Sequence, residues 1–213
     1  MADIFREVEE DLRRDQAAKL WKRYGRHAIA AALVVVLAVA GYEAWRAYDR
    51  DRQEQLADDF ATAKALADSD ERSAAIEAFA AVGAPGQSGY GTLAAFERAQ
   101  LLADGGDAEG ARVLWNEIAA DGRAPFAPVA TLLAISSEID GGDAGALNGR
   151  LDTLKSNFPA YRPLALELQA LLALRQGDGE TARLHLTAVA DDLSAPPGLR
   201  ARASELLQAL DDQ

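Results

Sequence analysis

An aspartate recurs along this chain at a nearly constant spacing. It stands at positions 70, 107, 143 and 178, so the separations are 37, 36 and 35 residues. The residues four, eight and eleven positions after each aspartate are apolar: Ala74, Ala78 and Ala81; Ala111, Trp115 and Ile118; Leu147, Leu151 and Leu154; Ala182, Leu186 and Val189. Offsets of 4, 8 and 11 share one face of an α-helix. The spacing therefore predicts a helix with one buried face after each aspartate.

A second apolar set precedes each aspartate. It falls fourteen, thirteen and four residues earlier: Leu56, Ala57 and Leu66; Leu93, Ala94 and Ala103; Val129, Ala130 and Ile139; Leu164, Ala165 and Leu174. Each unit thus reads as helix, turn, helix. Such units cannot bury their apolar faces alone, so they are expected to stack into an array, closed here by an end helix over 198–213 with Leu199, Ala203, Leu206 and Leu210 facing inward.

The predicted turns have suitable chemistry. Gly105-Gly106 precedes Asp107, Gly141-Gly142 precedes Asp143, and Gly177 precedes Asp178. Glycine ends a helix cheaply because it adopts positive φ, and aspartate then caps the next helix by accepting from its free N–H groups. The Asp-Gly-Gly-Asp runs lack the alternating ligands and closing glutamate of a calcium loop, so no calcium site is expected.

Composition favours an all-α fold and a soluble acidic domain. Aromatic residues make up only 7%, and β-branched residues are sparse outside one segment. The net charge is −12, and residues 46–213 hold 15 Lys/Arg against 27 Asp/Glu. Such a domain should repel nucleic acid and anionic lipid. The chain has no cysteine, which excludes a disulfide framework or a thiolate metal site.

The β-branched segment is an uncharged run from Ala28 to Tyr42. Fifteen helical residues cover only ~22 Å, but Trp21 and Tyr24 before the run and Trp45 after it extend the span with an aromatic belt. Residues 8–27 hold six Lys/Arg and residues 43–62 hold three, which places the N-terminus in the cytoplasm. We expect a cytoplasmic amphipathic segment over 1–27, a transmembrane helix over 28–45 and a periplasmic repeat domain over 46–213, in a bacterial inner membrane.

Two alternatives to an uncleaved anchor stay open. Ala38-Val39-Ala40 before Gly41 has the small-x-small form of a signal-peptide cleavage site, and a run this short could be the core helix of a soluble protein. The preceding residues 3–24 carry their own helical period through Ile4, Val8 and Leu12. That segment is either a simple lead into the membrane or a docking helix for a membrane partner or for the inner leaflet.

The repeat resembles the tetratricopeptide repeat, a 34-residue helix–turn–helix with Gly-Asp at its turn, a small residue four positions later and a larger apolar one at eight. Leu147 departs from the small residue, Pro159 matches the family's closing proline, and the family's Trp and Tyr are missing from the first helices. The opening MADIFREVEEDLRRDQAAKLWKRYGRH and the layout that follows it resemble the YfgM-like family, an ancillary subunit of the SecYEG translocon. That resemblance implies the Sec translocon and periplasmic chaperones as partners.

No catalytic or cofactor-binding constellation is found. His27 and His185 have no second ligand nearby, Ser136-Ser137 lacks a matched base, and the glycines at 83, 86, 89 and 91 lack the strand and lysine of a phosphate loop. We expect no enzyme activity, cofactor, metal or small-molecule substrate. Trp115 is expected in the core, and the four glycines in a long loop between the first and second repeats.

Tetratricopeptide geometry predicts a partner-binding groove. Positions fourteen, eleven and seven before each aspartate would point into a concave face: Leu93, Phe96, Gln100, Val129, Leu132, Ser136, Leu164 and Leu171. The alternative is that these side chains simply pack between helices. We expect a non-enzymatic adaptor that holds partner proteins at the outer face of the inner membrane. The resemblance to the YfgM-like family implies that its task is to pass translocated proteins from the Sec translocon to chaperones. The alternative is a repeat scaffold of envelope assembly or cell division that is independent of Sec.

Overall fold

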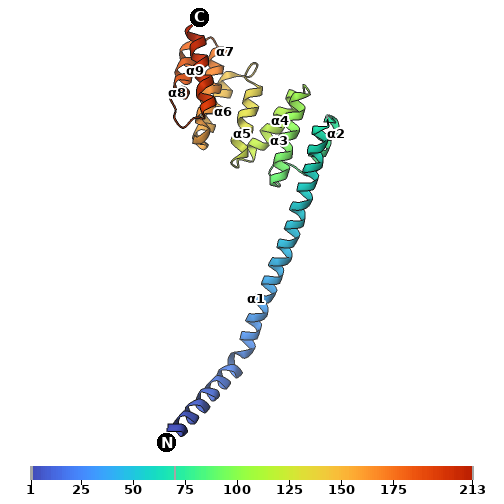
Figure 1. The fold of residues 1–213 in the computed structure, drawn as a ribbon, viewed down its shortest axis with the longest axis vertical. Coiled ribbons are helices and arrows are strands. Elements are labelled where there is room, and N and C mark those ends of the chain that lie inside the picture. The colour runs from blue at the N-terminus through green and yellow to red at the C-terminus, as the bar shows by residue number, and fades with distance from the viewer. Residues whose placement is uncertain (1, 70, 213) are drawn as a thin grey trace. The chain divides into compact units, whose positions relative to one another are not determined.

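The computed structural model describes residues 2–69 and 71–212, with side chains described for 21–27, 29–30, 32–69 and 71–212. The described chain contains helices and no strand, as expected (Figure 1). The elements are α1 (Ala2–Asp68), α2 (Arg72–Val82), α3 (Gly89–Asp104), α4 (Ala108–Ala120), α5 (Phe126–Ser137), α6 (Ala144–Asn157), the 3₁₀ turn η1 (Pro159–Tyr161), α7 (Arg162–Arg175), α8 (Gly179–Ala190) and α9 (Pro197–Asp211).

The chain divides into two compact units, residues 1–55 and residues 56–213. In the first, α1 runs without a break through the apolar run and past Gly41, as the sequence predicts. Among the described residues, the part of α1 that begins at Trp21 is the one helix long and apolar enough to cross a membrane. The side chains of its most apolar stretch are not buried against the rest of the protein. The side chains that would form the amphipathic face over residues 3–20 lie outside the described set.

The second unit is a stack of helix pairs (Figure 1). The end of α1 packs against α2 around Phe60 and Phe79. The pairs that follow are α3 with α4, α5 with α6 and α7 with α8, and α9 covers the last pair. Four apolar clusters follow one another along the stack, the first around Phe79 and the last around Leu199. Because each cluster joins sequence neighbours, every pair is stabilised by the pair beside it.

The predicted buried stripes are confirmed in α4, α6 and α8. All nine residues at the three offsets are buried: Ala111, Trp115 and Ile118; Leu147, Leu151 and Leu154; Ala182, Leu186 and Val189. In α9, Leu199 and Ala203 are buried, and Leu206 and Leu210 pack against the same cluster, as expected of an end helix. Trp115 lies in the core.

The prediction for the first pair is wrong by one residue. Asp70 lies outside the described residues; α2 begins at Arg72 and Glu71 occupies its N-cap. The buried side chains of α2 are Ala75, Phe79 and Val82, whereas Ala74 and Ala78 are half-buried and Ala81 is exposed. Counting from Glu71 places α2 in register with the other second helices, because the same offsets of 4, 8 and 11 now reach its buried face.

The predicted capping is confirmed at three turns. Asp107, Asp143 and Asp178 accept from the N–H groups of Gly110, Ala146 and Thr181 at 2.9, 2.7 and 3.0 Å. These bonds satisfy N–H groups that have no partner inside the helix.

Replacing Asp143 with Ala is expected to lower the free energy of unfolding by about 0.5–2 kcal/mol, the usual cost of a lost N-cap. Glu71→Ala is the matched control, because the Glu71 side chain makes no capping bond. Urea denaturation measures both. Equal losses in the two variants would contradict the assignment of the caps.

The glycine-rich connection is shorter than predicted. The loop between α2 and α3 covers residues 83–88, and Gly89 and Gly91 belong to the first turn of α3. Gly91 accepts no side chain, since a Cβ there would lie 2.8 Å from the carbonyl oxygen of Ala84. Gly91 therefore allows the loop to approach the first turn of α3 closely. Ser88 caps this helix by accepting from the Gly91 N–H at 2.9 Å.

Candidate partner-binding surface

The first helices of the pairs have clearly separated faces. Ala94, Ala130 and Ala165, each thirteen residues before its aspartate, are completely buried. One position earlier, Leu93 is 41% exposed and Val129 37% exposed, and Leu164 is half-buried. The small buried alanines let neighbouring helices approach closely. The larger side chain one position earlier is at least partly exposed to solvent.

The eight predicted groove residues, which we call the first-helix face, are not equally accessible. Gln100 and Ser136 are exposed, and Gln100 donates to Asp104 at 2.9 Å. Phe96 is half-buried against the ring of Phe126, with centroids 6.2 Å apart. The remaining two, Leu132 and Leu171, are half-buried, and Leu132 packs against the third cluster of the stack.

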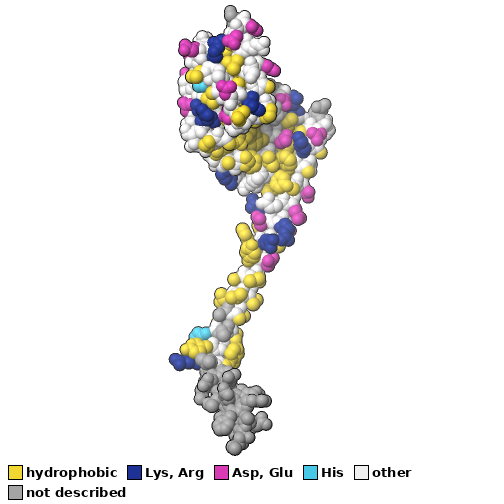
Figure 2. Space-filling view, turned by 60° about the vertical axis from the view of Figure 1, so that its left-hand side comes forward, with side chains coloured by type: hydrophobic (Ala, Val, Ile, Leu, Met, Phe, Trp, Pro, Cys, Tyr) yellow, Lys and Arg dark blue, Asp and Glu magenta, His cyan; other side chains and the backbone are white. Residues whose placement is uncertain are grey.

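The structure thus places these residues partly in the interfaces between helices and partly in solvent. Leu93 and Val129 remain available to a partner, whereas Phe96 and Leu132 also support the fold. Figure 2 shows hydrophobic side chains gathered in a hollow of the repeat domain below its C-terminal helices. Contiguous exposed apolar surface is typical of binding sites, and that this face binds a partner stays a prediction.

Ion pairs stand at the two ends of the first-helix face. Lys64 on α1 pairs with Glu97 on α3 at 3.4 Å, and Arg202 on α9 pairs with Glu167 on α7 at 2.9 Å. The Glu167 carboxylate raises the pKa of Arg202 by hydrogen bonding. Since α5, between them, presents no charged side chain along its length, the middle of the face is uncharged.

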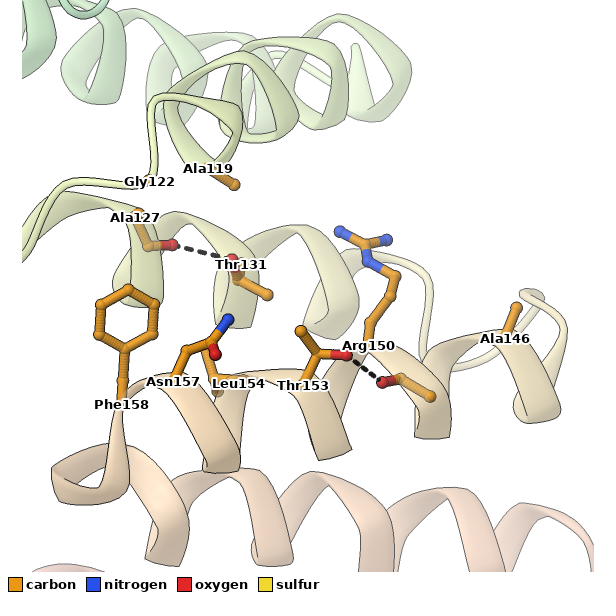
Figure 3. Close-up of a pocket in the computed structure, with 11 residues that line it drawn as sticks. Ala119, Gly122, Ala127, Thr131, Ala146, Arg150, Thr153, Leu154, Asn157 and Phe158 are labelled. Carbon is orange, nitrogen blue, oxygen red and sulfur yellow. Dashed lines mark hydrogen bonds between the residues drawn. The ribbon is translucent and has the colours of Figure 1, made fainter.

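A pocket that was not predicted from the sequence lies between α4, α5 and α6. It has a volume of about 500 Å³, and Figure 3 shows Ala119 and Ala127 on one side of it, opposite Asn157 and Phe158. Such a volume is within the range of ligand sites, but most of the lining side chains are small.

Repeat-equivalent positions explain the pocket. Between α6 and α7 the gap is closed by Lys155, which donates to Gln169 at 2.7 Å, whereas the corresponding residues of α4 and α5 are Ala119 and Ala134. Gly149 stands where α4 and α8 carry Val113 and Leu184, and a Cβ at Gly149 would meet nothing within 4 Å. Of these residues, Ala119 and Gly149 line the hollow and leave it unfilled. A comparison of aligned repeats could have found this signal.

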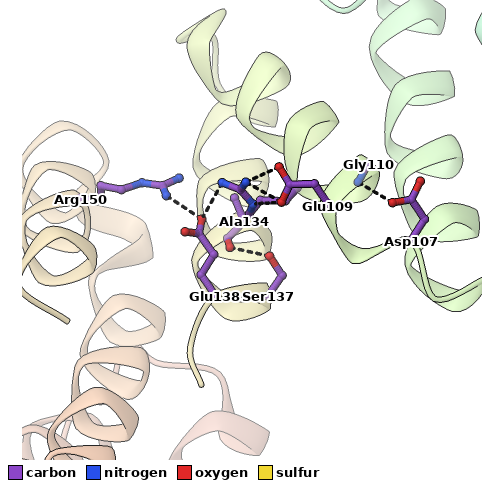
Figure 4. Close-up of polar contacts among 8 residues, drawn as sticks. Asp107, Glu109, Gly110, Ala134, Ser137, Glu138 and Arg150 are labelled. Atoms are coloured by element: carbon purple, nitrogen blue, oxygen red, sulfur yellow. Dashed lines mark hydrogen bonds and ion pairs between the residues drawn. The ribbon is translucent and has the colours of Figure 1, made fainter. Parts of the chain in front are cut away.

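Arg150, one of the residues that line this pocket, belongs to a polar network, part of which is shown in Figure 4. Arg150 on α6 donates to Asn116 on α4 at 2.7 Å and to Glu138 after α5 at 3.2 Å. Arg112 pairs with both Glu109 and Glu138. The network therefore joins α4 to α6 and to the turn that follows α5.

A second polar cluster lies where α6, α7 and α8 meet. The buried Gln169 amide donates to Asp152 at 3.0 Å, and Lys155 pairs with Asp152 at 2.8 Å. Hydrogen bonding from Lys155 lowers the pKa of Asp152. Burial, then the positive charge of Lys155, lowers the pKa of His185, although Asp152 and Asp178 act in the opposite direction.

The lowered pKa of His185 predicts a loss of stability in acid. The unfolded chain, with an imidazole pKa of about 6.5, binds a proton more readily than the folded chain, so the free energy of unfolding should fall as the pH drops through about 6.5. Urea midpoints at pH 7.5 and 5.5 measure this loss. The fall in stability between the two pH values should be smaller in His185→Gln. An equal fall in the variant and the native protein would show that other groups cause it.

Among the described residues, no group of three or more His, Cys, Asp or Glu is placed to hold a metal ion. Ser137 donates to the Ala134 carbonyl of its own helix at 2.7 Å. Within the described residues, no such metal-binding group forms around His185.

An apolar helix followed by stacked helical hairpins defines the chain as a helical-repeat protein with a potential membrane anchor. The sequence family described as a tetratricopeptide repeat-like domain matches residues 18–195, most of the chain, and the chain belongs to that family. Proteins built from such repeats are typically non-enzymatic scaffolds that bind other proteins. No curated protein and no solved structure shows detectable similarity to the chain.

Proposed function

We propose that the protein is a non-enzymatic adaptor, anchored in the membrane by α1, that binds partner proteins on its first-helix face. The observation that carries this proposal is the exposed apolar side chain at equivalent positions of successive first helices, Leu93 and Val129. Leaving such side chains in water is unfavourable unless a partner covers them.

The proposal places residues 1–27 in the cytoplasm, 28–45 in the bacterial inner membrane and 46–213 in the periplasm. The excess of Lys/Arg before the apolar run supports this orientation. The acidic repeat domain supports a protein partner over nucleic acid or anionic lipid.

The partners proposed are the Sec translocon and periplasmic chaperones, with transfer of translocated proteins as the task. Support comes from the resemblance of the N-terminal segment and of the domain layout to the YfgM-like family. The alternative partners are proteins of envelope assembly or cell division, which a repeat domain facing the periplasm could equally reach.

Site-specific photocrosslinking in intact cells tests this proposal. A photoreactive amino acid is placed at Leu93 or Val129 of the full-length protein, and crosslinked partners are identified by mass spectrometry. Leu184 on α8 is the matched control, because it is a 69% exposed leucine far along the stack. Phe96 and Leu132 are avoided because they also pack inside the domain.

We expect translocon subunits or chaperones crosslinked from Leu93 and Val129 and absent from Leu184. Crosslinking of division or cell-wall proteins from the same two positions would instead support the alternative partners, which are independent of Sec. Equal crosslinking from all three positions would refute the first-helix face as the binding surface.

A further inference from the structure

We propose that the first-helix face takes an amphipathic helical segment with an apolar side and a row of Lys or Arg along one edge. This inference rests on the proposed function, because it states the chemistry of the partner for that surface. Charge complementarity along one edge of the face carries it.

The edge in question is formed by the turns between the first and second helix of each pair. Three exposed aspartates, Asp68, Asp104 and Asp140, stand three residues before the N-cap residues Glu71, Asp107 and Asp143. They recur every 36 residues, so the stacked repeats place them in one row at the ends of the first helices. The corresponding residue of the fourth pair is Arg175, which donates to the carbonyl oxygens of Ile139 and Gly142.

Neither capping nor ion pairing accounts for this row, although Asp104 accepts a hydrogen bond from Gln100 on its own helix. Asp68 and Asp104 are the last residues of α1 and α3, and Asp140 follows α5 by three residues, where the partial negative charge of a helix C-terminus disfavours a carboxylate. None of the three caps a helix, and none forms an ion pair with a described residue. The exposed capping aspartates Asp107 and Asp143 beside them add to the negative charge.

The opposite edge of the stack has a different character. Its turns carry Asp121, Asp191 and Asp192 together with Arg123 and Arg162, and Asp121 is paired with Arg123 at 2.6 Å. The aspartate edge also carries Arg72, the first residue of α2, beside Gly105, and Arg175. Even so, acidic side chains outnumber basic ones by more on this edge than on the opposite edge, so it is the more negative of the two. A segment with one row of cations is attracted in a single orientation, and a segment with a row of carboxylates is repelled.

The full-length protein in nanodiscs of zwitterionic phosphatidylcholine provides the test. Three fluorescent peptides share the same leucine side at helical spacing and differ only along one edge, which carries five Lys, five Gln or five Glu. Fluorescence anisotropy measures binding, and empty nanodiscs report any binding to lipid. We expect the Lys peptide to bind at least ~10-fold more tightly than the Gln peptide, with the Glu peptide weakest and the Lys advantage lost in high salt.

Three sets of variants separate the possible outcomes. Asp68→Asn, Asp104→Asn and Asp140→Asn together should reduce the Lys peptide to the affinity of the Gln peptide, while Asp121→Asn, Asp191→Asn and Asp192→Asn should change little. Leu93→Ser with Val129→Ser should weaken the binding of both the Lys peptide and the Gln peptide. If both peptides bind equally and the leucine–valine variant weakens both, the charge inference is overturned and the proposed function stands. If the Leu93 and Val129 variant weakens the binding of neither peptide, the proposed function fails as well. If the peptides bind empty nanodiscs as tightly as nanodiscs that hold the protein, the charge inference and the proposed function are both overturned.

Discussion

Arginine in place of Val35 and Leu37 is expected to release the full-length protein from the membrane. Both side chains lie in the apolar run and are exposed on α1, with no protein surface to cover them. At the centre of a membrane-spanning helix each change from Val or Leu to Arg costs about 3–4 kcal/mol, so the pair costs roughly 6–8 kcal/mol. The span would no longer insert. Carbonate extraction followed by immunoblotting measures the loss.

Gln53→Arg with Gln55→Arg is the matched control. It adds the same two charges at the same spacing on the same helix, beyond the apolar run, and should leave the protein in the membrane pellet. N-terminal sequencing of the native protein completes the test. A mature chain that begins at Gly41 would show that the apolar run is a cleaved signal peptide. A native protein that carbonate extracts from the membrane would show that the run is the core helix of a soluble protein.

The repeat architecture could be predicted because its determinants are local and periodic. A capping aspartate and three apolar offsets specify where a helix begins and which face it buries, and stacking requires only that the units recur. The same logic failed at the first turn. Asp70 and Glu71 are adjacent acidic residues, and the sequence pattern alone favours the aspartate, whereas packing of the large Phe79 side chain inside the domain selects a register counted from Glu71.

The candidate surface was only partly predictable. The offsets assign Leu93 and Val129 to the predicted face, and both side chains are exposed. The offsets could not show that Phe96 and Leu132 are half-buried. That depends on how far neighbouring first helices stand apart, which is set by long-range contacts such as the Phe96–Phe126 ring pair. The pocket beside Gly149 has the same origin, since a small residue leaves a hollow only when its neighbours are small too.

Replacing Phe79 with Ala is expected to unfold the first hairpin. Phe79 is 1% exposed and its ring lies 5.5 Å from that of Phe60 on α1, within a cluster that joins the first pair to α3. Truncating a buried phenylalanine costs about 3–5 kcal/mol. Because each pair contacts only its neighbours, amide hydrogen exchange should accelerate in α2 and leave α7 to α9 nearly unchanged. Leu184→Ala, which truncates an exposed side chain, should change exchange nowhere by a comparable amount.

A matched pair of alanines on the same helix tests the register itself. Ala75 is completely buried and Ala81 is exposed, whereas counting from Asp70 would place Ala81 inside. Ala75→Lys should therefore destabilise the first hairpin by several kcal/mol, because it forces an unpaired charge and excess volume into a closed site. Ala81→Lys should stay within about 0.5 kcal/mol of the native protein, as surface substitutions usually do. Urea denaturation measures both losses. A larger loss in Ala81→Lys than in Ala75→Lys would support the register counted from Asp70.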